Sequence, residues 1–139
     1  MTKRSIIWNP TFISEYSLRR SLEKVFSEVS FSGKRCLDVG CGDRQYEGFF
    51  QEGEYIGIDV ETSGREPELK KPDIFYDGVS MLFDDNIFDF VICTQVLEHV
   101  QNPQSLLTEM VRVMKPGASI FISVPFVFPE HETPYDFFR

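Results

Sequence analysis

The chain has 139 residues, of which 42% are hydrophobic and 26% charged, and its formal net charge is −8 at pH 7. This length suits one domain, and the composition is that of a globular protein, which excludes a disordered or collagen-like chain. No stretch reaches the roughly 18 consecutive apolar residues of a membrane-spanning helix, and residues 1–10 lack the apolar centre of a secretory signal. We therefore expect a cytoplasmic protein without a membrane span. The negative charge repels phosphate backbones, which argues against broad nucleic-acid binding and favours small-molecule or protein partners.

The three cysteines, Cys36, Cys41 and Cys93, are odd in number and lack C-x-x-C spacing. Such a set predicts neither a disulfide framework nor a zinc site. We expect them to be small core residues, and we expect no metal site.

Hydrophobic patterning in the first half of the chain predicts strands that alternate with short helices. In chain order, we expect an amphipathic helix over 18–29, a buried strand over 36–39, a turn over 40–42, a brief helix over 46–50 and a second strand over 55–58 that stops at Asp59. Between residues 62 and 72, glycine and two prolines leave room only for a very short helix.

The second half of the chain continues the alternation. We expect a weak strand over 74–76, a strand over 88–93 and a strand over 119–124. Between the last two strands, Asn102 caps a helix that has Pro103 at its first position, and residues 115–117 stop it. The apolar face of that helix is marked by Leu106, Leu107, Met110, Val111 and Met114.

This alternation is typical of an α/β fold with a mostly parallel sheet and right-handed crossovers. Ligands of such sheets bind outside the carboxyl ends of the strands, where the strand order reverses. The residues that follow each predicted strand are therefore the candidates for a functional site.

The first strand is followed by a glycine loop, in which Cys41 lies between Gly40 and Gly42; the loop comes directly after Asp38-Val39. Glycine lets backbone approach a ligand closely, so a nucleotide fits here, although a tight structural turn is an equal alternative. Gln45 stands where the dinucleotide fingerprint requires a third glycine. This departure argues against a dinucleotide-dependent oxidoreductase.

Carboxylates follow the second and third strands. Asp59 lies roughly 20 residues beyond the glycine loop, where an acid can accept hydrogen bonds from both ribose hydroxyls. Asp77, Gly78 and Val79 place a carboxylate and backbone amides where an adenine ring could be recognised. A plain turn former remains the alternative for Asp59, and an Asp-Gly turn for Asp77.

The fourth strand leads into a run of polar and ionisable side chains. Thr94 and Gln95 come first, and Glu98 and His99 follow as candidates for acid or base chemistry. A helix-start carboxylate and a partly exposed histidine are the alternative reading of that last pair.

Together these motifs resemble the class I S-adenosylmethionine-dependent methyltransferases, in the branch called methyltransferase type 11. The resemblance covers almost the whole chain, and it rests on residues 37–42, 58–59, 88–99 and 112–117. It implies a Rossmann-like, doubly wound sheet of about five strands in the order 3-2-1-4-5, within a single domain over residues 1–139 that lacks the last two strands of the family. It also implies that the N-terminal helix covers the cofactor.

The resemblance implies a role for each candidate residue toward S-adenosylmethionine and its product S-adenosylhomocysteine. Asp38, Gly40, Cys41, Gly42, Thr94 and Gln95 would surround the methionine portion. Asp59 would bind the ribose diol, and Val60, Asp77, Gly78 and Val79 would surround the adenine. Glu98 and His99 would face a small-molecule acceptor, as tentative catalytic residues, and no metal would be required.

Relatives continue beyond a stretch similar to residues 134–139, so the chain resembles a methyltransferase truncated at its C-terminus. The fifth strand would then be a sheet edge, and such an edge invites a homo-oligomer. The alternative function is a non-catalytic module that binds S-adenosylmethionine or S-adenosylhomocysteine and is completed by another chain. The sequence does not indicate whether the acceptor atom is oxygen, nitrogen or carbon.

Overall fold

The computed structural model describes residues 12–63, 67–125 and 137, and these divide between two compact units, residues 1–30 and 31–139. In the first unit, the described residues are 12–30, and they include helix α1 (Phe12–Ser27). This confirms the predicted N-terminal helix, which begins earlier than its apolar pattern indicated. Within the described residues, no helix combines the length and the apolar character needed to cross a membrane.

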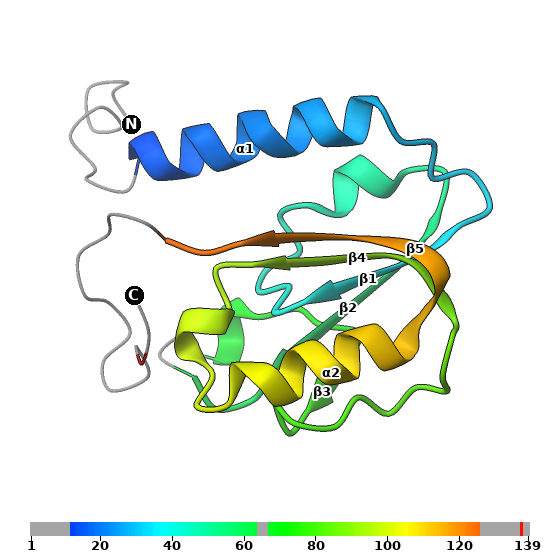
Figure 1. Ribbon diagram of the computed structural model, residues 1–139. Helices are drawn as coiled ribbons and strands as arrows, with labels where there is room; N and C mark the ends of the chain where they lie inside the picture. Colours follow the sequence, from blue (N-terminus) through cyan, green and yellow to red (C-terminus); the bar gives the residue numbers. More distant parts are fainter. Residues whose placement is uncertain (1–11, 64–66, 126–136, 138–139) are drawn as a thin grey trace. The chain divides into compact units, whose positions relative to one another are not determined.

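The second unit is built on a five-stranded sheet, shown edge-on in Figure 1. Its strands are β1 (Arg35–Val39), β2 (Glu54–Val60), β3 (Ile74–Tyr76), β4 (Phe88–Thr94) and β5 (Met114–Ser123). They lie in the order β3-β2-β1-β4-β5, and every neighbouring pair is parallel. The predicted fold class and strand order are confirmed. Since the order reverses between β1 and β4, the carboxyl ends of these two strands form the topological switch point.

One face of the sheet packs against helix α2 (Pro103–Val113). Its cap is the predicted one, because the Asn102 side chain accepts a hydrogen bond from the Ser105 amide at 3.2 Å. Leu106, Met110 and Val113 are fully buried in the core. The prediction that Val111 shares this face was wrong: with 3.6 residues per turn it lies about 140° from Leu106, and it is 68% exposed.

The other face carries an aromatic cluster of Phe31, Phe50 and Phe90, with ring centroids 4.8 to 6.1 Å apart. Phe50 ends the short 3₁₀ helix η1 (Glu47–Phe50), which fulfils the prediction of a brief helix there. A second 3₁₀ helix, η2 (Pro67–Leu69), is the very short helix expected in the region of glycine and proline. Both faces of the sheet therefore bury apolar side chains.

Strand β5 begins earlier than predicted. Residues 115–117, expected to separate helix from strand, belong to β5, and Met114 is its first residue instead of a helical core position. The pairing shifts from Phe88 with Met114 to Phe90 with Ser119, which marks a bulge. Proline lacks an amide hydrogen, and Gly117 adopts φ +81°, so this segment suits a bulge where ladder bonds are interrupted.

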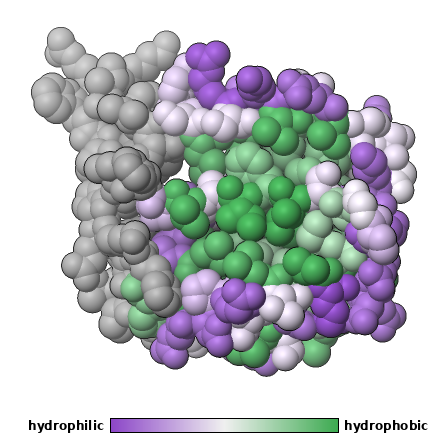
Figure 2. Space-filling view, viewed as in Figure 1, coloured by the Kyte–Doolittle hydropathy of each residue, from purple (hydrophilic) through white to green (hydrophobic). Residues whose placement is uncertain are grey.

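The outer edge of the sheet is β5, which pairs with β4 alone among the described strands. Ile120 and Ile122 are each 38% exposed and Val124 is 55% exposed. Figure 2 shows apolar surface gathered over the region where Figure 1 draws this strand. The described part of the chain thus presents an apolar strand edge.

All three cysteines are free and buried, as expected for core residues. Burial raises the pKa of the Cys36 thiol to about 11 and that of the Cys93 thiol to about 12. Their side chains fill space in the sheet and its first loop.

Candidate functional site

The loop after β1 is held against the end of β2. The amides of Gly40 and Cys41 both donate to the Ile58 carbonyl, at 2.8 and 3.1 Å. Gly40 has φ +74°, and a Cβ there would lie 2.3 Å from Cγ2 of Val96. Glycine is required at position 40 for both conformation and space, so the predicted turn is confirmed and the loop packs directly on the segment after β4.

Asp38 lies inside β1 at the switch point and is fully buried. Its Oδ2 accepts a hydrogen bond from the Tyr55 hydroxyl at 2.7 Å, whereas its Oδ1 has no hydrogen-bond partner among the described residues. Burial raises the pKa of this carboxyl from 3.8 to about 7, although the Tyr55 hydrogen bond opposes the rise. A buried carboxylate oxygen without a donor fits a cationic or N–H group of a ligand.

Asp59 is the second-last residue of β2, since the strand runs one residue beyond the predicted stop, to Val60. The Gly42 amide donates to its Oδ2 at 2.9 Å and the Val60 amide to its Oδ1 at 2.7 Å. Lys70 Nζ forms an ion pair with the same Oδ1 at 3.2 Å and donates to the Val60 carbonyl at 2.6 Å. The predicted ribose-binding acid therefore ties the glycine loop to β2 and has a lysine partner.

A cleft of about 490 Å³ opens at the carboxyl ends of β2 and β3. Val60 and Asp77, both predicted to surround the adenine, lie on its wall. Its full lining is Val60, Glu61, Thr62, Phe75, Tyr76, Asp77, Ser80 and Leu82. The cleft begins at Val60, the residue after Asp59, and provides space for a planar ring.

Asp77 organises the loop at this cleft. Its Oδ1 accepts from the Val79 amide at 2.8 Å and the Ser80 amide at 2.7 Å, and these two bonds hold the pKa of the exposed carboxyl below its usual range. Gly78 has φ +80°, and a Cβ there would lie 3.2 Å from Val60 Cγ1. The predicted adenine-binding residues 77–79 and Val60 are thus brought together.

The end of β4 contributes the other predicted residues. Thr94 is buried, and Gln95, at φ +54°, donates its amide to the Ser123 carbonyl at 2.9 Å and its side-chain nitrogen to Ser123 Oγ at 3.2 Å. A short 3₁₀ helix, η3 (Leu97–His99), follows and carries the two candidate catalytic residues. Glu98 is buried, and its Oε1 lies 3.8 Å from His99 Nε2.

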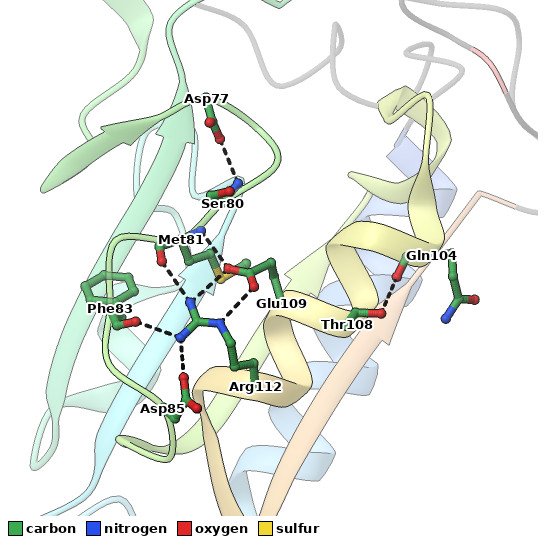
Figure 3. Close-up of polar contacts among 9 residues, drawn as sticks. All are labelled: Asp77, Ser80, Met81, Phe83, Asp85, Gln104, Thr108, Glu109 and Arg112. Carbon is green, nitrogen blue, oxygen red and sulfur yellow. Dashed lines mark hydrogen bonds and ion pairs between the residues drawn. The ribbon is translucent and has the colours of Figure 1, made fainter.

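Arg112 on α2 anchors the segment between β3 and β4, as Figure 3 shows. It donates to the carbonyls of Met81 (2.9 Å) and Phe83 (2.8 Å), and it pairs with Asp85 and Glu109. Glu109 in turn accepts from the Met81 amide at 2.9 Å. The helix thereby fixes the segment that begins with the Asp77 loop.

Three contributors to this site were not predicted from the sequence: Tyr55, Lys70 and Arg112. Tyr55 lies in a predicted strand, but strand alternation does not show which polar group its hydroxyl meets. Lys70 stands beside Lys71 in a segment without periodicity, so no pattern distinguishes the buried lysine from the exposed one. Arg112 lies in one of the motifs that carry the resemblance, residues 112–117, but the sequence indicated no role for its side chain.

A parallel sheet with a glycine loop at its switch point, an acid at the end of β2 and a cleft beside that acid defines a Rossmann-like nucleotide-binding domain. Residues 12–137 match the family model described as a methyltransferase domain. The chain therefore belongs to the methyltransferase domain family, and S-adenosylmethionine is the cofactor that this membership implies. The resemblance to S-adenosylmethionine-dependent methyltransferases inferred from the motifs is confirmed.

Individual relatives agree with this assignment. The chain is 34% identical over 109 residues to the ubiquinone biosynthesis O-methyltransferase of Dechloromonas aromatica, covering 68% of this chain and 46% of the relative. A S-adenosylmethionine-dependent methyltransferase structure from Aquifex aeolicus is 25% identical with a TM-score of 0.58, covering 72% of this chain and 61% of that one. The [4+2]-cyclase SpnF is 29% identical with a TM-score of 0.58, covering 73% and 43%. The chain spans about half the length of the curated relatives it matches.

Proposed function

We propose that the protein transfers the methyl group of S-adenosylmethionine to a small-molecule acceptor. The observation that carries the proposal is the fully buried Asp38, whose Oδ1 lacks a donor beside the glycine loop. Asp59 lies near the carboxyl end of β2, and the cleft of about 490 Å³ begins at the next residue, Val60. A ligand with an ammonium group, a ribose and an adenine matches these three features in order.

Each candidate residue has a role in this proposal. Asp38 binds the ammonium group of the amino-acid tail, and the backbone of Gly40, Cys41 and Gly42 lines its path. The Cys41 thiol acts only as packing, because a Cβ at Gly57 would lie 2.8 Å from its Sγ. Asp59 accepts hydrogen bonds from the ribose hydroxyls. The adenine is enclosed by Val60, Asp77, Gly78 and Val79, and the methionine end is flanked by Thr94 and Gln95.

When bound, the cofactor supplies an electrophilic methyl group on a sulfonium. The task of the chain is to align the acceptor behind that methyl and to exclude water, and alignment alone can lower a barrier by roughly 7–11 kcal/mol. We assign Glu98 and His99 to the acceptor side, where His99 takes the proton of a hydroxyl or amine and Glu98, 3.8 Å away, supports the charge that forms.

Three further parts of the proposal concern the acceptor atom, the cellular compartment and self-association. We put an oxygen nucleophile first, because the curated relatives are named as ubiquinone biosynthesis O-methyltransferases.

We place the protein in the cytoplasm, since three free buried thiols suit a reducing compartment. We also propose self-association through the β5 edge, supported by the exposure of Ile120 and Ile122.

The test combines binding with transfer. Calorimetry with S-adenosylhomocysteine should show binding that Asp59→Ala weakens by about 10- to 100-fold, because a charge-assisted hydrogen bond is lost. The exposed Asp84→Ala serves as the matched control and should bind as the wild type does. Equal affinity for the Asp59 variant and the wild type would remove the basis of the assignment.

Methyl transfer itself is measured with S-adenosylmethionine labelled on its methyl group and a pool of phenols, quinols and sugars. We expect label in a small molecule, and we expect Glu98→Gln and His99→Ala to reduce turnover while leaving cofactor affinity within about threefold. Because one structural relative is named as a cyclase, binding without any transfer would favour a different activity on the same fold.

A further inference from the structure

Lys70 is an uncommon kind of lysine, because its side chain is only 2% exposed. Lysine is almost never buried unless it is paired. Its ammonium has two partners at the end of β2: it is ion-paired with the Asp59 carboxylate at 3.2 Å, and it donates a hydrogen bond to the Val60 carbonyl at 2.6 Å. The Asp59 side chain is itself 10% exposed, so lysine and acid bury each other.

The hydrogen-bonding capacity of Asp59 is nearly used up by the protein. A carboxylate offers about four acceptor positions, two on each oxygen. With the ion pair counted, three positions are engaged: the Val60 amide donates to Oδ1, the Lys70 ammonium is ion-paired with the same oxygen at 3.2 Å, and the Gly42 amide donates to Oδ2. One position is left, whereas a ribose diol that binds through both hydroxyls needs two.

The contacts around Lys70 indicate which group can give way. The two backbone amides belong to β2 and to the glycine loop, which is itself bonded to Ile58. The main chain next to Lys70 is also held, because the Lys71 amide donates to the Gly42 carbonyl at 2.8 Å. The four-carbon stem of Lys70 is flexible, so its ammonium can leave while its backbone stays in place.

We propose that Lys70 is a latch on the ribose position: it holds Asp59 in the free protein and is displaced when both hydroxyls of the cofactor ribose bind that carboxylate. The inference rests on the proposed function, since it takes the cofactor as the incoming ligand. Lys70 is then a positioning residue that sets how tightly the cofactor binds. The cofactor must break the lysine contact, so its affinity is lower than Asp59 alone would give.

The first test is Lys70→Met, which keeps the stem and removes the charge. It leaves the buried Asp59 oxygen without its lysine, so we expect a lower unfolding temperature and binding of S-adenosylhomocysteine about 5- to 50-fold tighter. The gain should be much smaller for the 2′-deoxy analogue, since one hydroxyl fits the position already open. Lys71→Met changes the exposed neighbouring lysine and should leave both temperature and affinity unchanged.

A second test uses the wild-type protein. Acylation of lysines, read by mass spectrometry, should modify Lys70 slowly in the free protein and faster when S-adenosylhomocysteine is present, with Lys71 as the internal reference. Equal or slower modification in the presence of ligand would overturn the latch. This measurement also decides the matter if Lys70→Met does not fold.

The outcomes separate the latch from the proposed function. If the wild type binds S-adenosylhomocysteine and Lys70→Met binds it equally or more weakly, the latch is wrong and the function stands. If neither protein binds it, both are wrong. If binding emerges or strengthens in Lys70→Met, both are supported.

Discussion

Asp38 combines two properties that rarely occur together at one residue. It is fully buried, and one of its oxygens has no hydrogen-bond donor among the described residues. Leaving such a group unpaired costs free energy that a ligand ammonium can recover on binding. Asp38 therefore lowers the stability of the free protein and raises its affinity for a ligand that carries an ammonium group.

The ionisation of Asp38 gives the protein a specific pH dependence. The folded pKa, about 7, lies above the ordinary value of 3.8, so the folded protein keeps a proton that the unfolded chain loses. The contribution of this group to the free energy of unfolding therefore declines as pH rises from about 4 to 7, and it is level above that range.

Cofactor binding should show the opposite trend, because an ammonium group prefers the ionised carboxylate. We expect the affinity for S-adenosylhomocysteine to rise by at most about tenfold per pH unit up to pH 7 and to level off above it. Asp38→Asn should bind more weakly and without this slope. Titration calorimetry from pH 5.5 to 8.5 checks both, and an unchanged slope in the variant would show that another group titrates.

At the level of single residues, the sequence predicted positions better than contacts. Asp38, Gly40 and Asp59 could be found because each follows from the end of an apolar strand. The Tyr55 bond to Asp38 and the Lys70 pair with Asp59 join residues 17 and 11 positions apart through loops whose course no local pattern determines. Their discovery required the three-dimensional structure.

Among the elements, α2 does more than cover the sheet. Through Arg112 and Glu109 it binds backbone atoms of Met81 and Phe83, which follow the loop at the adenine cleft. The chain between β3 and β4 has no helix of its own over residues 77–87. Its conformation therefore depends on side chains supplied by the helix.

Arg112→Met tests that dependence. Removing the guanidinium takes the donor from two carbonyls and from the Asp85 carboxylate and leaves Glu109 with the Met81 amide, so we expect the free energy of unfolding to fall by about 1–3 kcal/mol and S-adenosylhomocysteine affinity to fall with it. Urea denaturation and calorimetry measure the two effects. Arg19→Met, which breaks an exposed pair on α1, is the control and should cost less than about 1 kcal/mol. Equal losses in the two variants would contradict an anchoring role.

Element types were predicted well and their ends less well. Strand patterns placed β1, β3 and β4 to within a residue or so, because a strand covered on both faces is a continuous apolar run. The start of β5 was missed, since a proline and a glycine normally stop regular structure and here they occupy a bulge. Val111 was predicted on the buried face of α2 because its side chain is apolar, although its position around the helix points away from that face.

For the molecule as a whole, alternation of strands and helices was enough to predict a parallel sheet, and family resemblance supplied its order. The resemblance also predicted that the fifth strand is a sheet edge, and β5 pairs with β4 alone among the described strands. That strand shows Ile120, Ile122 and Val124 to solvent within the described residues. Exposed apolar edges are surfaces on which further chain tends to pair.

Self-association through this edge is therefore measurable. We expect the wild type to sediment as a concentration-dependent dimer and Ile122→Lys to shift it toward monomer, because a charge on an edge strand opposes pairing. Glu61→Gln, on the wall of the cleft near the opposite edge, changes the net charge by the same one unit and should leave the dimer intact. A wild type that is monomeric at all concentrations would contradict the proposal.

The three buried thiols offer a practical consequence. Cys36 lies in β1, Cys93 in β4 and Cys41 in the loop after β1, and burial keeps the pKa of each between about 11 and 12. A cysteine reacts with Ellman's reagent only when its thiolate can reach and attack the disulfide of the reagent, so the coloured thiolate should be released only as fast as the protein opens around these cysteines. The rate of thiol modification therefore reports how often the native state opens, and a bound nucleoside should lower that rate.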